Sequence, residues 1–435
     1  MRQSGRLMLD IRLIRENPQE VKDRLTARAG GAAVAALIDD VLACDESRRQ
    51  AETEKQRLQS ERNRLSKEIG QRKRAGEDTS ETEALVKGFA SELADWETAA
   101  ERADVRQREL LLGIPNMPHE ECPVGHSAEE NPEVRTWGRK PEFAFTPKDH
   151  VVLGTTLGML DFESATKITG SAFVVYRGAG ARLERALINF LLDVHTEGHG
   201  YTEVLPPYLI HADSLVGTGQ LPKFADQIYA CPEDGLYLAP TAEVPVTNLH
   251  REELVKHEQL PLNFVAYTPC FRREAGAAGV VTRGLIRMHQ FDKVELVKIT
   301  TPETSMDELE RLTGHAESIL QQLGLHYRVI ELCTGDIGFG STKTYDIEVW
   351  APGQNSYLEV SSCSCFGDYQ ARRMNLRFKD AETGKNRFPH TLNGSGTALA
   401  RLYVALLETY QREDGSILLP EVLRPYVKSL EIGGA

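Results

Sequence analysis

Arginine and carboxylate side chains gather in one stretch of the chain, residues 263–299, in a pattern that suits the binding of an anion. Its four arginines and three carboxylates are Arg272, Arg273, Arg283, Arg287, Glu274, Asp292 and Glu295. A guanidinium is a planar fork that grips phosphate or carboxylate with two hydrogen bonds. A strand buried only for structure rarely carries so many charges, because each must be paired or hydrated. The stretch indicates a site for an anionic ligand that also carries an ammonium or amino group. A solvated surface hairpin with paired charges is the second interpretation.

The same stretch predicts two strands joined by a loop. Residues 264–267 and Phe271 are expected in the first strand, and residues 285–299 in the second. The loop, residues 275–284, contains Gly276, Gly279 and Gly284. Glycine lets a backbone turn sharply and approach a ligand closely. We therefore expect a β-hairpin that presents its arginines at the loop end.

Elements after residue 153 mix helix and strand without a regular alternation. Helices are predicted at 182–195 and 306–323, and strands at 201–207, 345–349 and 357–361. The segment 392–396 is expected to open a further helix that reaches residue 410. Such an order favours an α+β fold with an antiparallel sheet and flanking helices. The sequence has neither a phosphate-binding loop ending in Lys-Ser/Thr nor a G-x-G-x-x-G after a strand, so a nucleotide must be held by other means.

Bulk composition limits the size and class of the protein. The chain has 435 residues, 41% hydrophobic and 26% charged, enough for two or three domains of an ordinary globular protein. The formal net charge is −13, so the whole molecule does not attract nucleic acid. A nucleic-acid surface must be a local basic patch, and no DNA partner is expected.

Cysteine usage and hydropathy bear on location. The seven cysteines are scattered, odd in number and without zinc spacing, which fits a reducing compartment, and we expect a cytoplasmic protein. No apolar run approaches membrane-spanning length, so no membrane association is expected. Arg2 and Arg6 are not followed by the apolar segment of a signal peptide.

A long helix is predicted in the N-terminal third. Its apolar positions follow alternating steps of three and four: Leu37, Val41, Cys44, Ala51, Leu58, Leu65 and Ile69. Some seam positions carry Arg48, Lys55 and Arg62, and Gly70 and Gly76 mark the end region. Ser80, with Glu83 three residues on, then forms a capping-box pattern.

A second long helix is predicted after Ser80. Its heptad seam comprises Val86, Phe89, Leu93, Trp96, Ala100, Ala103, Gln107 and Leu110. Two such helices joined by a short polar turn are expected to fold back as an antiparallel coiled coil. At about 1.5 Å rise per residue this arm projects roughly 45–55 Å.

The first helix and the turn carry seven basic residues that could contact RNA phosphates: Arg57, Arg62, Arg64, Lys67, Arg72, Lys73 and Arg74. Acids among them, such as Glu61 and Glu68, leave open a plain solvated helix. Coiled coils also serve oligomerisation, which leaves a third use of the arm open.

The motifs together resemble those of class II aminoacyl-tRNA synthetases. Residues 268–276 (TPCFRREAG) and 282–287 (TRGLIR) resemble the second signature motif, and residues 393–396 (NGSG) with Arg401 resemble the third. The helix ending near His199 and the strand to Pro207 resemble the first, which in that class lies at a dimer interface. The resemblance therefore implies a homodimer.

Within the class, the resemblance is to the seryl-tRNA synthetase family. It rests on residues 9–12 (LDIR), 218–224 (TGQLPKF), 241–243 (TAE) and 360–364 (VSSCS), together with the arm. It runs from about Met8 to Tyr426 in family order and spacing. Residues 1–7 lie outside it, and Met8 is a second candidate start.

The resemblance implies that serine and ATP form seryl-adenylate and pyrophosphate, and that serine then moves to the 3′ end of tRNA(Ser), with tRNA(Sec) left open as a second acceptor. A carboxylate oxygen attacks the α-phosphorus, so the chemistry needs no protein nucleophile. The protein must position the reactants and neutralise charge.

Residue roles are carried over from the resemblance. Arg272 bridges the serine carboxylate and the α-phosphate, Arg401 holds the γ-phosphate of a bent ATP, and Arg283 contacts the phosphates from the loop. Glu274 accepts from the adenine amino group and Phe291 stacks on the ring. Further ATP-site positions are Arg273, Val360 and Ser361.

Two more sets follow from the resemblance. Glu359 and Ser362 match the magnesium ligands, and oxygen ligands suit Mg²⁺. The serine pocket comprises Thr241, Ala242, Glu243, Arg272, Glu295 and Ser395. Such a pocket needs buried donors and acceptors that an alanine substrate would leave unpaired. Taken singly, Phe291 also fits a core aromatic, and Ser395 a helix cap.

Several positions depart from the family pattern. Arg273 stands where serine is usual, and Val280-Val281 where Arg-Asp is usual, so the loop is less charged and its contacts to ATP or the tRNA acceptor end are open. Leu358 stands where arginine is common, and Cys365 where asparagine is common. Residues 397–400 read TALA in place of Leu-Ala-Val-Gly. None of these changes removes a residue assigned to chemistry.

Two other classes are weighed against this one. A class II synthetase-like amino acid ligase acting on a carrier protein would share the catalytic motifs but typically lacks the arm. A non-enzymatic RNA-binding or scaffold protein would have no reason to keep the catalytic set together. We therefore expect an N-terminal tRNA-binding domain with the arm at residues 1–114, and a catalytic domain at residues 115–435.

Overall fold

The computed structural model describes residues 9–275 and 283–433. Within it the chain divides into two compact units, of which the N-terminal unit comprises Met1–Thr26 and Gly30–Pro115. The second unit comprises Ala27–Ala29 and Asn116–Ala435; it contains nearly all of the domain that the sequence predicts to be catalytic and is called the catalytic unit below. Met8, the loop glycines Gly276 and Gly279, and Val280-Val281 lie outside the described residues.

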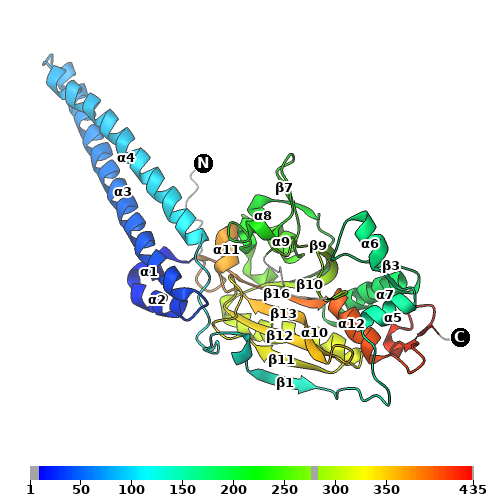
Figure 1. Ribbon diagram of the computed structural model, residues 1–435. Helices are drawn as coiled ribbons and strands as arrows, with labels where there is room; N and C mark the ends of the chain where they lie inside the picture. The colour runs from blue at the N-terminus through cyan, green and yellow to red at the C-terminus, as the bar shows by residue number, and fades with distance from the viewer. Residues whose placement is uncertain (1–8, 276–282, 434–435) are drawn as a thin grey trace. The chain divides into compact units, whose positions relative to one another are not determined.

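Helices alone make up the described part of the N-terminal unit. Asp10 caps the first by accepting a hydrogen bond from the backbone N of Arg12 at 2.9 Å. The last two, of 44 and 33 residues, run side by side as an antiparallel pair (Figure 1). The helices are α1 (Ile11–Glu16), α2 (Pro18–Thr26), α3 (Gly31–Arg74) and α4 (Ser80–Leu112).

The seam of this coiled coil confirms the predicted arm. Every predicted seam position of α4 is buried or half-buried, and the fully buried ones of α3 include Val41, Ala51 and Leu58. The predicted set missed Asp45, a buried acid that pairs with three arginines: Arg15, Arg48 and Arg49.

One predicted boundary of the arm was wrong, at the start of α4. The first arm helix ends at Arg74, in the end region that Gly70 and Gly76 predicted, and Gly70 itself lies inside α3, because a single glycine within an otherwise helix-forming run lowers stability without ending the helix. Ser80 is the first residue of α4 and not its cap. Thr79 precedes the helix and donates its hydroxyl to Glu83 at 2.6 Å, while the backbone N of Ser80 bonds to Asp78.

The catalytic unit is built on an eight-stranded sheet in the order β1-β11-β12-β13-β16-β10-β9-β4. Neighbouring strands are antiparallel except for β4 and β9, which are parallel. This confirms the predicted antiparallel sheet. The strands are β1 (Glu133–Trp137), β4 (Thr202–Glu203), β9 (Leu262–Phe271), β10 (Gln290–Thr300), β11 (Tyr327–Glu331), β12 (Lys343–Ala351), β13 (Ser356–Cys365) and β16 (His390–Ala398).

Three long helices pack against one face of the sheet: α7 (Ala179–Asp193), α10 (Ser305–Gln322) and α12 (Leu399–Thr409) (Figure 1). Side chains along a strand alternate between its two faces. On β10, Val294 and Leu296 therefore enter the hydrophobic core with these helices, while Lys293 and Glu295 point to the opposite face. That opposite face carries the site described below.

Shorter elements complete the catalytic unit. The helices are α5 (His150–Thr156), α6 (Phe162–Ile168), α8 (Ala212–Thr218), α9 (Glu243–Thr247) and α11 (Tyr369–Met374). The strands are β2 (Leu160–Asp161), β3 (Val175–Tyr176), β5 (Leu209–His211), β6 (Ala230–Cys231), β7 (Leu236–Leu238), β8 (Leu254–Lys256), β14 (Arg377–Lys379), β15 (Asn386–Arg387), β17 (Ile417–Leu418) and β18 (Glu431–Ile432). Over the described part of the chain, no helix is both long and apolar enough to span a membrane.

Three strand and helix predictions need correction. The second hairpin strand begins at Gln290, because residues 285–289 bond elsewhere: the backbone N of Leu285 bonds to His150 Nε2 at 3.1 Å. The segment 392–396 lies in β16, and the helix opens only at Leu399. The strand predicted at 201–207 shrinks to β4, since the two prolines after Leu205 lack the N–H that a ladder requires.

Candidate active site

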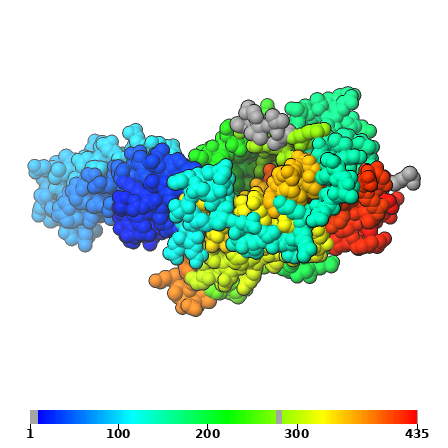
Figure 2. Space-filling view, turned by 60° about the horizontal axis from the view of Figure 1, so that its bottom comes forward, coloured from blue at the N-terminus to red at the C-terminus, as the bar shows by residue number. Residues whose placement is uncertain are grey.

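A cavity of about 600 Å³ opens on the sheet face that the three long helices leave free. In the space-filling view, green and orange segments of the catalytic unit border a hollow in its surface (Figure 2). The structure brings ten of the predicted site residues together in the lining: Thr241, Glu243, Arg272, Glu274, Phe291, Glu295, Glu359, Ser362, Ser395 and Arg401.

Strand alternation explains how residues far apart in sequence meet here. Ser395 on β16 lies opposite Glu295 on β10, and Asn393 lies opposite Ser364 on β13. Their neighbours Leu392 and Cys363 point the other way, into the core. Because Ser395 lies within a strand, the helix-cap interpretation of this residue is excluded.

One end of the cavity is rich in buried polar groups. Glu243, at the start of α9, accepts a hydrogen bond from Gln370 Nε2 at 2.7 Å. Burial and then the negative charge of Glu295 raise the pKa of Glu243 to about 7. Glu295 forms an ion pair with Lys293, also in the lining. The carboxylates and the nearby hydroxyl of Thr241 can receive an ammonium group and a small hydroxyl.

The middle of the cavity holds the hairpin residues. The guanidinium of Arg272 lies over the ring of Phe291, 5.1 Å from its centroid, and Nε donates to the carbonyl of Pro240 at 3.3 Å. Glu274 has a positive φ of 50° and pairs with Arg287 Nε at 2.5 Å. The aromatic ring offers a stacking surface to a planar base, and the guanidinium beside it offers a positive partner to a phosphate.

Arg401 and Glu359 occupy the other end. Arg401 Nη1 donates to the Glu359 carbonyl at 2.8 Å, and Nε donates to the carbonyl of Ile286 at 3.3 Å. Ser362 follows Glu359 on the same strand and also lines the cavity. A carboxylate and a hydroxyl are the hard oxygen donors that Mg²⁺ prefers.

Asp346 is a site residue that the sequence reasoning missed. It lines the cavity opposite Ser362, and its Oδ1 is buried without a hydrogen-bond partner. Burial and the charge of Glu359 raise its pKa well above the ordinary value. Lys293, Gln370 and Asn393 were also missed. Strand alternation from the predicted Glu295 and Ser395 points to Lys293 and Asn393, whereas no local pattern singles out Gln370.

The described residues contain no group of three or more His, Cys, Asp or Glu side chains arranged to hold a metal. A divalent cation at Glu359 and Ser362 would therefore complete its shell with oxygens from bound substrate or water. The orphaned oxygen of Asp346 offers a further oxygen donor beside those two residues. The donor set fits a hard cation bound together with a phosphate ligand.

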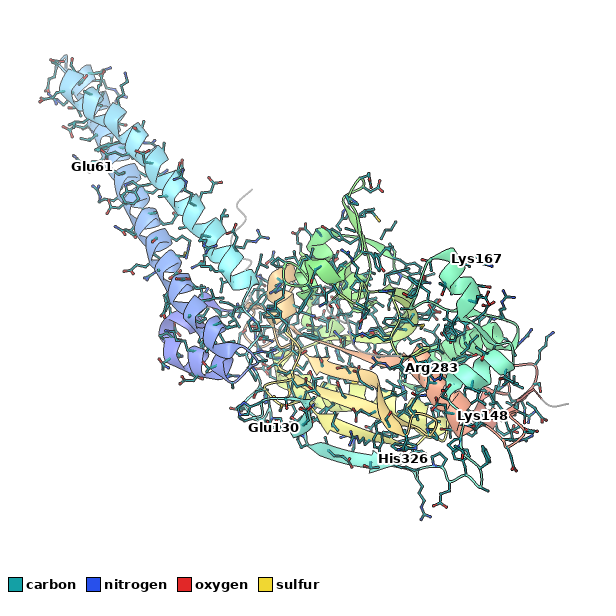
Figure 3. All side chains as sticks on the ribbon, in the orientation of Figure 1. Glu61, Glu130, Lys148, Lys167, Arg283 and His326 are labelled. Atoms are coloured by element: carbon teal, nitrogen blue, oxygen red, sulfur yellow. The ribbon has the colours of Figure 1, made fainter. Side chains whose placement is uncertain are left out.

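Five predicted site residues do not line the cavity. Ala242 and Val360 belong to the core, and the Ser361 hydroxyl donates to the carbonyl of Ser395 at 2.5 Å. Arg273 is exposed, with its backbone N bonded to the carbonyl of Gln227. Arg283 pairs with Asp149 at 2.9 Å and lies beside the segment of Lys148 (Figure 3).

The arm residues divide into paired and unpaired cations. Arg57, Arg64, Arg72 and Lys73 each pair with an acid of the arm. One such acid, Glu61, projects from α3 (Figure 3) and bonds to Arg64 at 2.6 Å. No described acid forms an ion pair with three of the arm's cations: Arg62, Lys67 and Arg74.

The fold and the cavity agree with what the comparisons with known proteins show. The family model described as "tRNA synthetase class II core domain (G, H, P, S and T)" matches residues 229–410. The model described as "Seryl-tRNA synthetase N-terminal domain" matches residues 8–118. These two matches define the class of the protein: a class II synthetase core that follows an N-terminal helical domain.

Full-length relatives narrow the class. The serine–tRNA ligase of Akkermansia muciniphila is 63% identical over 419 residues, which cover 96% of this chain and 97% of that protein. The serine–tRNA ligase of Laribacter hongkongensis is 55% identical over 98% of this chain and 99% of that one. A solved seryl-tRNA synthetase of Pyrococcus horikoshii, complexed with ATP, is 38% identical with a TM-score of 0.93, covering 98% of this chain and 100% of that one. The chain belongs to the seryl-tRNA synthetase family.

This outcome confirms the predicted family and fold class. The alternative of a ligase acting on a carrier protein receives no support from these relatives. The second interpretation of the hairpin, a surface hairpin whose charges are all paired, holds for only two of its four arginines. Arg283 and Arg287 pair with acids. Arg272 pairs with no described carboxylate and faces the cavity.

Proposed function

We propose that this protein activates L-serine with ATP and transfers it to tRNA(Ser). The observation that carries the proposal is one cavity lined by ten predicted site residues that come from widely separated stretches of the sequence. Positioning the serine carboxylate against the α-phosphate makes the reaction effectively unimolecular. Fixed cations stabilise the charge that develops on the phosphate.

The serine would lie at the end of the cavity that holds Glu243 and Glu295. An ionised carboxylate there attracts the substrate ammonium, and the hydroxyls of Thr241 and Ser395 offer partners to the substrate. Threonine would be excluded because its methyl group needs extra room. Alanine would leave buried polar groups unpaired, which costs binding free energy.

ATP would lie along the rest of the cavity. Phe291 offers its ring to the adenine, and Glu274 offers an acceptor to the adenine amino group. Arg272 would contact the α-phosphate and the serine carboxylate together, and Arg401 the γ-phosphate. Arg273, Arg283, Val360 and Ser361 lie outside the lining, so we assign them supporting contacts to the loop or to the strand that carries Glu359.

Mg²⁺ is the cofactor that Glu359 and Ser362 would hold. When bound, it neutralises phosphate charge. Arg401, which contacts both the carbonyl and the carboxylate of Glu359, would keep that carboxylate oriented.

The N-terminal arm is proposed to bind tRNA. Its seven basic residues can contact backbone phosphates without reading bases, which suits recognition by shape. tRNA(Sec), read through the same kind of shape, is a second proposed acceptor. We further propose a homodimer, supported by two exposed leucines, Leu205 within the first motif and Leu209 just after it. We also propose a cytoplasmic location, supported by seven free cysteines.

The experiment that tests the proposal is amino-acid-dependent ATP–pyrophosphate exchange with the full chain. Exchange should be strongest with serine, much weaker with threonine and alanine, and absent without an amino acid. A preference for glycine or alanine over serine would overturn the pocket assignment. No exchange with any amino acid would overturn the proposed function.

A further inference from the structure

Arg28 has a buried guanidinium that bonds only to backbone carbonyls. It is 7% exposed and lies in the segment Ala27–Ala29, which belongs to the catalytic unit. Nη1 donates to Asn116 at 3.0 Å and Ser341 at 3.3 Å. Nη2 donates to Ile337 at 2.9 Å and Gly338 at 2.6 Å. Three of the four acceptors thus lie within five residues of each other.

The charge of Arg28 is compensated without a carboxylate. No described acid forms an ion pair with it, although an isolated buried charge is costly unless it is hydrogen-bonded. Burial lowers its pKa to about 10, so the side chain is still charged at neutral pH. A planar fork that satisfies four carbonyls fixes the positions of those carbonyls firmly.

Asn116 completes the hold on the same segment, Ile337 to Ser341. Its backbone N bonds to the carbonyl of Phe339 at 2.9 Å, and its Nδ2 donates to Gly340 at 3.0 Å. Together, Arg28 and Asn116 bind all five successive carbonyls of this segment. The two residues therefore fix the backbone of the whole segment.

The held segment is part of the cavity wall. Gly338 and Ser341 line the cavity, and Asn116 Nδ2 also donates at 2.8 Å to the carbonyl of Phe366, another lining residue. Neither Arg28 nor Asn116 lines the cavity, so their hydrogen bonds support this wall from outside it.

This wall stands at the amino-acid end of the cavity. The lining residues of β13 and its extension run from Glu359 through Ser362 and Ser364 to Phe366, and Arg401 lies at the Glu359 end. Ser364 lies opposite Asn393 in the register of β13 and β16, and Asn393 is close enough to Glu243 to influence the pKa of that carboxyl. The Phe366 end is thus the end where Glu243 lies.

We propose that Arg28 is a positioning residue for amino-acid binding, acting through the wall segment Ile337 to Ser341. It touches no substrate atom. It fixes the wall so that the space beside Glu243 admits serine in one orientation. The inference rests on the proposed function, because it takes that end of the cavity as the serine site.

The test uses full-length Arg28→Ala, Arg28→Lys and Asn116→Ala in serine-dependent pyrophosphate exchange. For Arg28→Ala the serine KM should rise about tenfold or more, the loss typical of leaving buried polar groups unpaired, while the ATP KM changes little. Arg28→Lys should lie between it and the wild type, because a lysine lacks the planar fork. Asn116→Ala should show the same serine-selective rise.

Chemical rescue of Arg28→Ala by an added guanidinium compound provides a measurement that would not change if Arg28 had only a general structural role. Millimolar ethylguanidinium should restore the serine KM of Arg28→Ala, and ethylammonium should not. Arg135→Ala is the matched control, because Arg135 is a half-buried arginine of the same unit that binds Glu317 bidentately outside the cavity lining. It should leave both KM values unchanged.

The outcomes separate the two proposals. If the folded variants keep the wild-type serine KM, or if serine and ATP KM rise equally, the role of Arg28 is refuted. If Arg28→Ala fails to fold, Arg28→Lys and Asn116→Ala decide in its place. A wild-type protein without serine-dependent exchange would refute the proposed function instead.

Discussion

Arg401 Nη1 donates to the carbonyl oxygen of Glu359 at 2.8 Å and lies 3.4 Å from a carboxylate oxygen of the same residue. Arg401 comes from the third motif, whereas Glu359 comes from a strand more than forty residues earlier. The cation proposed to bind ATP therefore contacts a residue proposed to hold Mg²⁺, so the two proposed roles lie side by side in the cavity.

The first prediction concerns Mg²⁺. In Glu359→Gln the Mg²⁺ concentration that half-saturates exchange should rise roughly tenfold or more, because a charged ligand is replaced by a neutral one. Titration of the exchange rate with Mg²⁺ measures this. Glu348→Gln is the control, since Glu348 lies opposite Glu359 in register but pairs with Arg328 outside the cavity lining. An unchanged Mg²⁺ requirement in Glu359→Gln would refute the ligand assignment.

The second prediction concerns the phosphate. In Arg272→Ala activation should fall on the order of 10²-fold or more, worth several kcal/mol, because the guanidinium is proposed to stabilise charge that develops in the transition state. The fold should persist, since Arg272 is exposed and its side chain makes one hydrogen bond, to Pro240. Exchange kinetics with circular dichroism check both points. Near wild-type exchange in the folded variant would contradict the proposed role of Arg272 at the phosphate.

The third prediction concerns pH. The pKa of Glu243 is raised to about 7 by burial and by Glu295, so below pH 7 this group is mostly protonated in the absence of substrate. The ionised form attracts the serine ammonium, so the serine KM should fall as the pH rises from 6 to 8. Glu243→Gln should bind serine weakly and lose this pH dependence.

The same raised pKa has an opposite effect on folding. An acid whose pKa is higher in the folded than in the unfolded state lowers the free energy of unfolding as the pH rises from the ordinary pKa, about 4.3, through 7.

Glu184→Gln is a suitable control for the pH dependence of the serine KM, because Glu184 is also a buried acid with a raised pKa but lies outside the cavity lining. Its KM profile should match the wild type.

Sequence pattern predicted the arm well, because a heptad seam is a local and repeated signal. It located Leu58 and Leu93 correctly, yet missed Asp45, whose burial depends on three arginines, one of them in α1. The segment around Ser395 was expected to open a helix because glycine and serine there suggest a cap. Tertiary pairing with β10 and β13 keeps it in a strand instead.

The residues of the candidate site could likewise be predicted where a local motif contains them, but not where their role depends on residues distant in sequence. Arg272 and Glu274 could be predicted because they fall within one motif, and Phe291 was carried over from the same resemblance. Asp346 and Arg28 could not, because their roles depend on contacts with residues distant in sequence. An acid on a strand and an arginine between two helices carry no local pattern that distinguishes them.

The fourth prediction concerns the cations of the arm. Arg62, Lys67 and Arg74 have no acid partner among the described residues, so their reversal to glutamate breaks no internal pair. The triple variant should bind tRNA more weakly, and its binding should depend less steeply on salt, because fewer counterions are released. Lys167, Lys385 and Lys428 of the catalytic unit also form no ion pair with a described acid, so their reversal to glutamate changes the net charge equally and should leave the salt dependence unchanged. Equal effects of the two triple variants would assign the binding to net charge alone.

Transfer of serine to tRNA by a protein shortened in the arm tests the account most directly. Residues 48–105 are replaced by a short linker, and none of the removed residues lines the cavity. Lys55 pairs with Glu97 across the two helices, so the cut ends lie near each other in register. We predict that serine-dependent pyrophosphate exchange persists near the full-chain rate while charging of tRNA collapses. Charging equal to that of the full chain would contradict the role assigned to the arm.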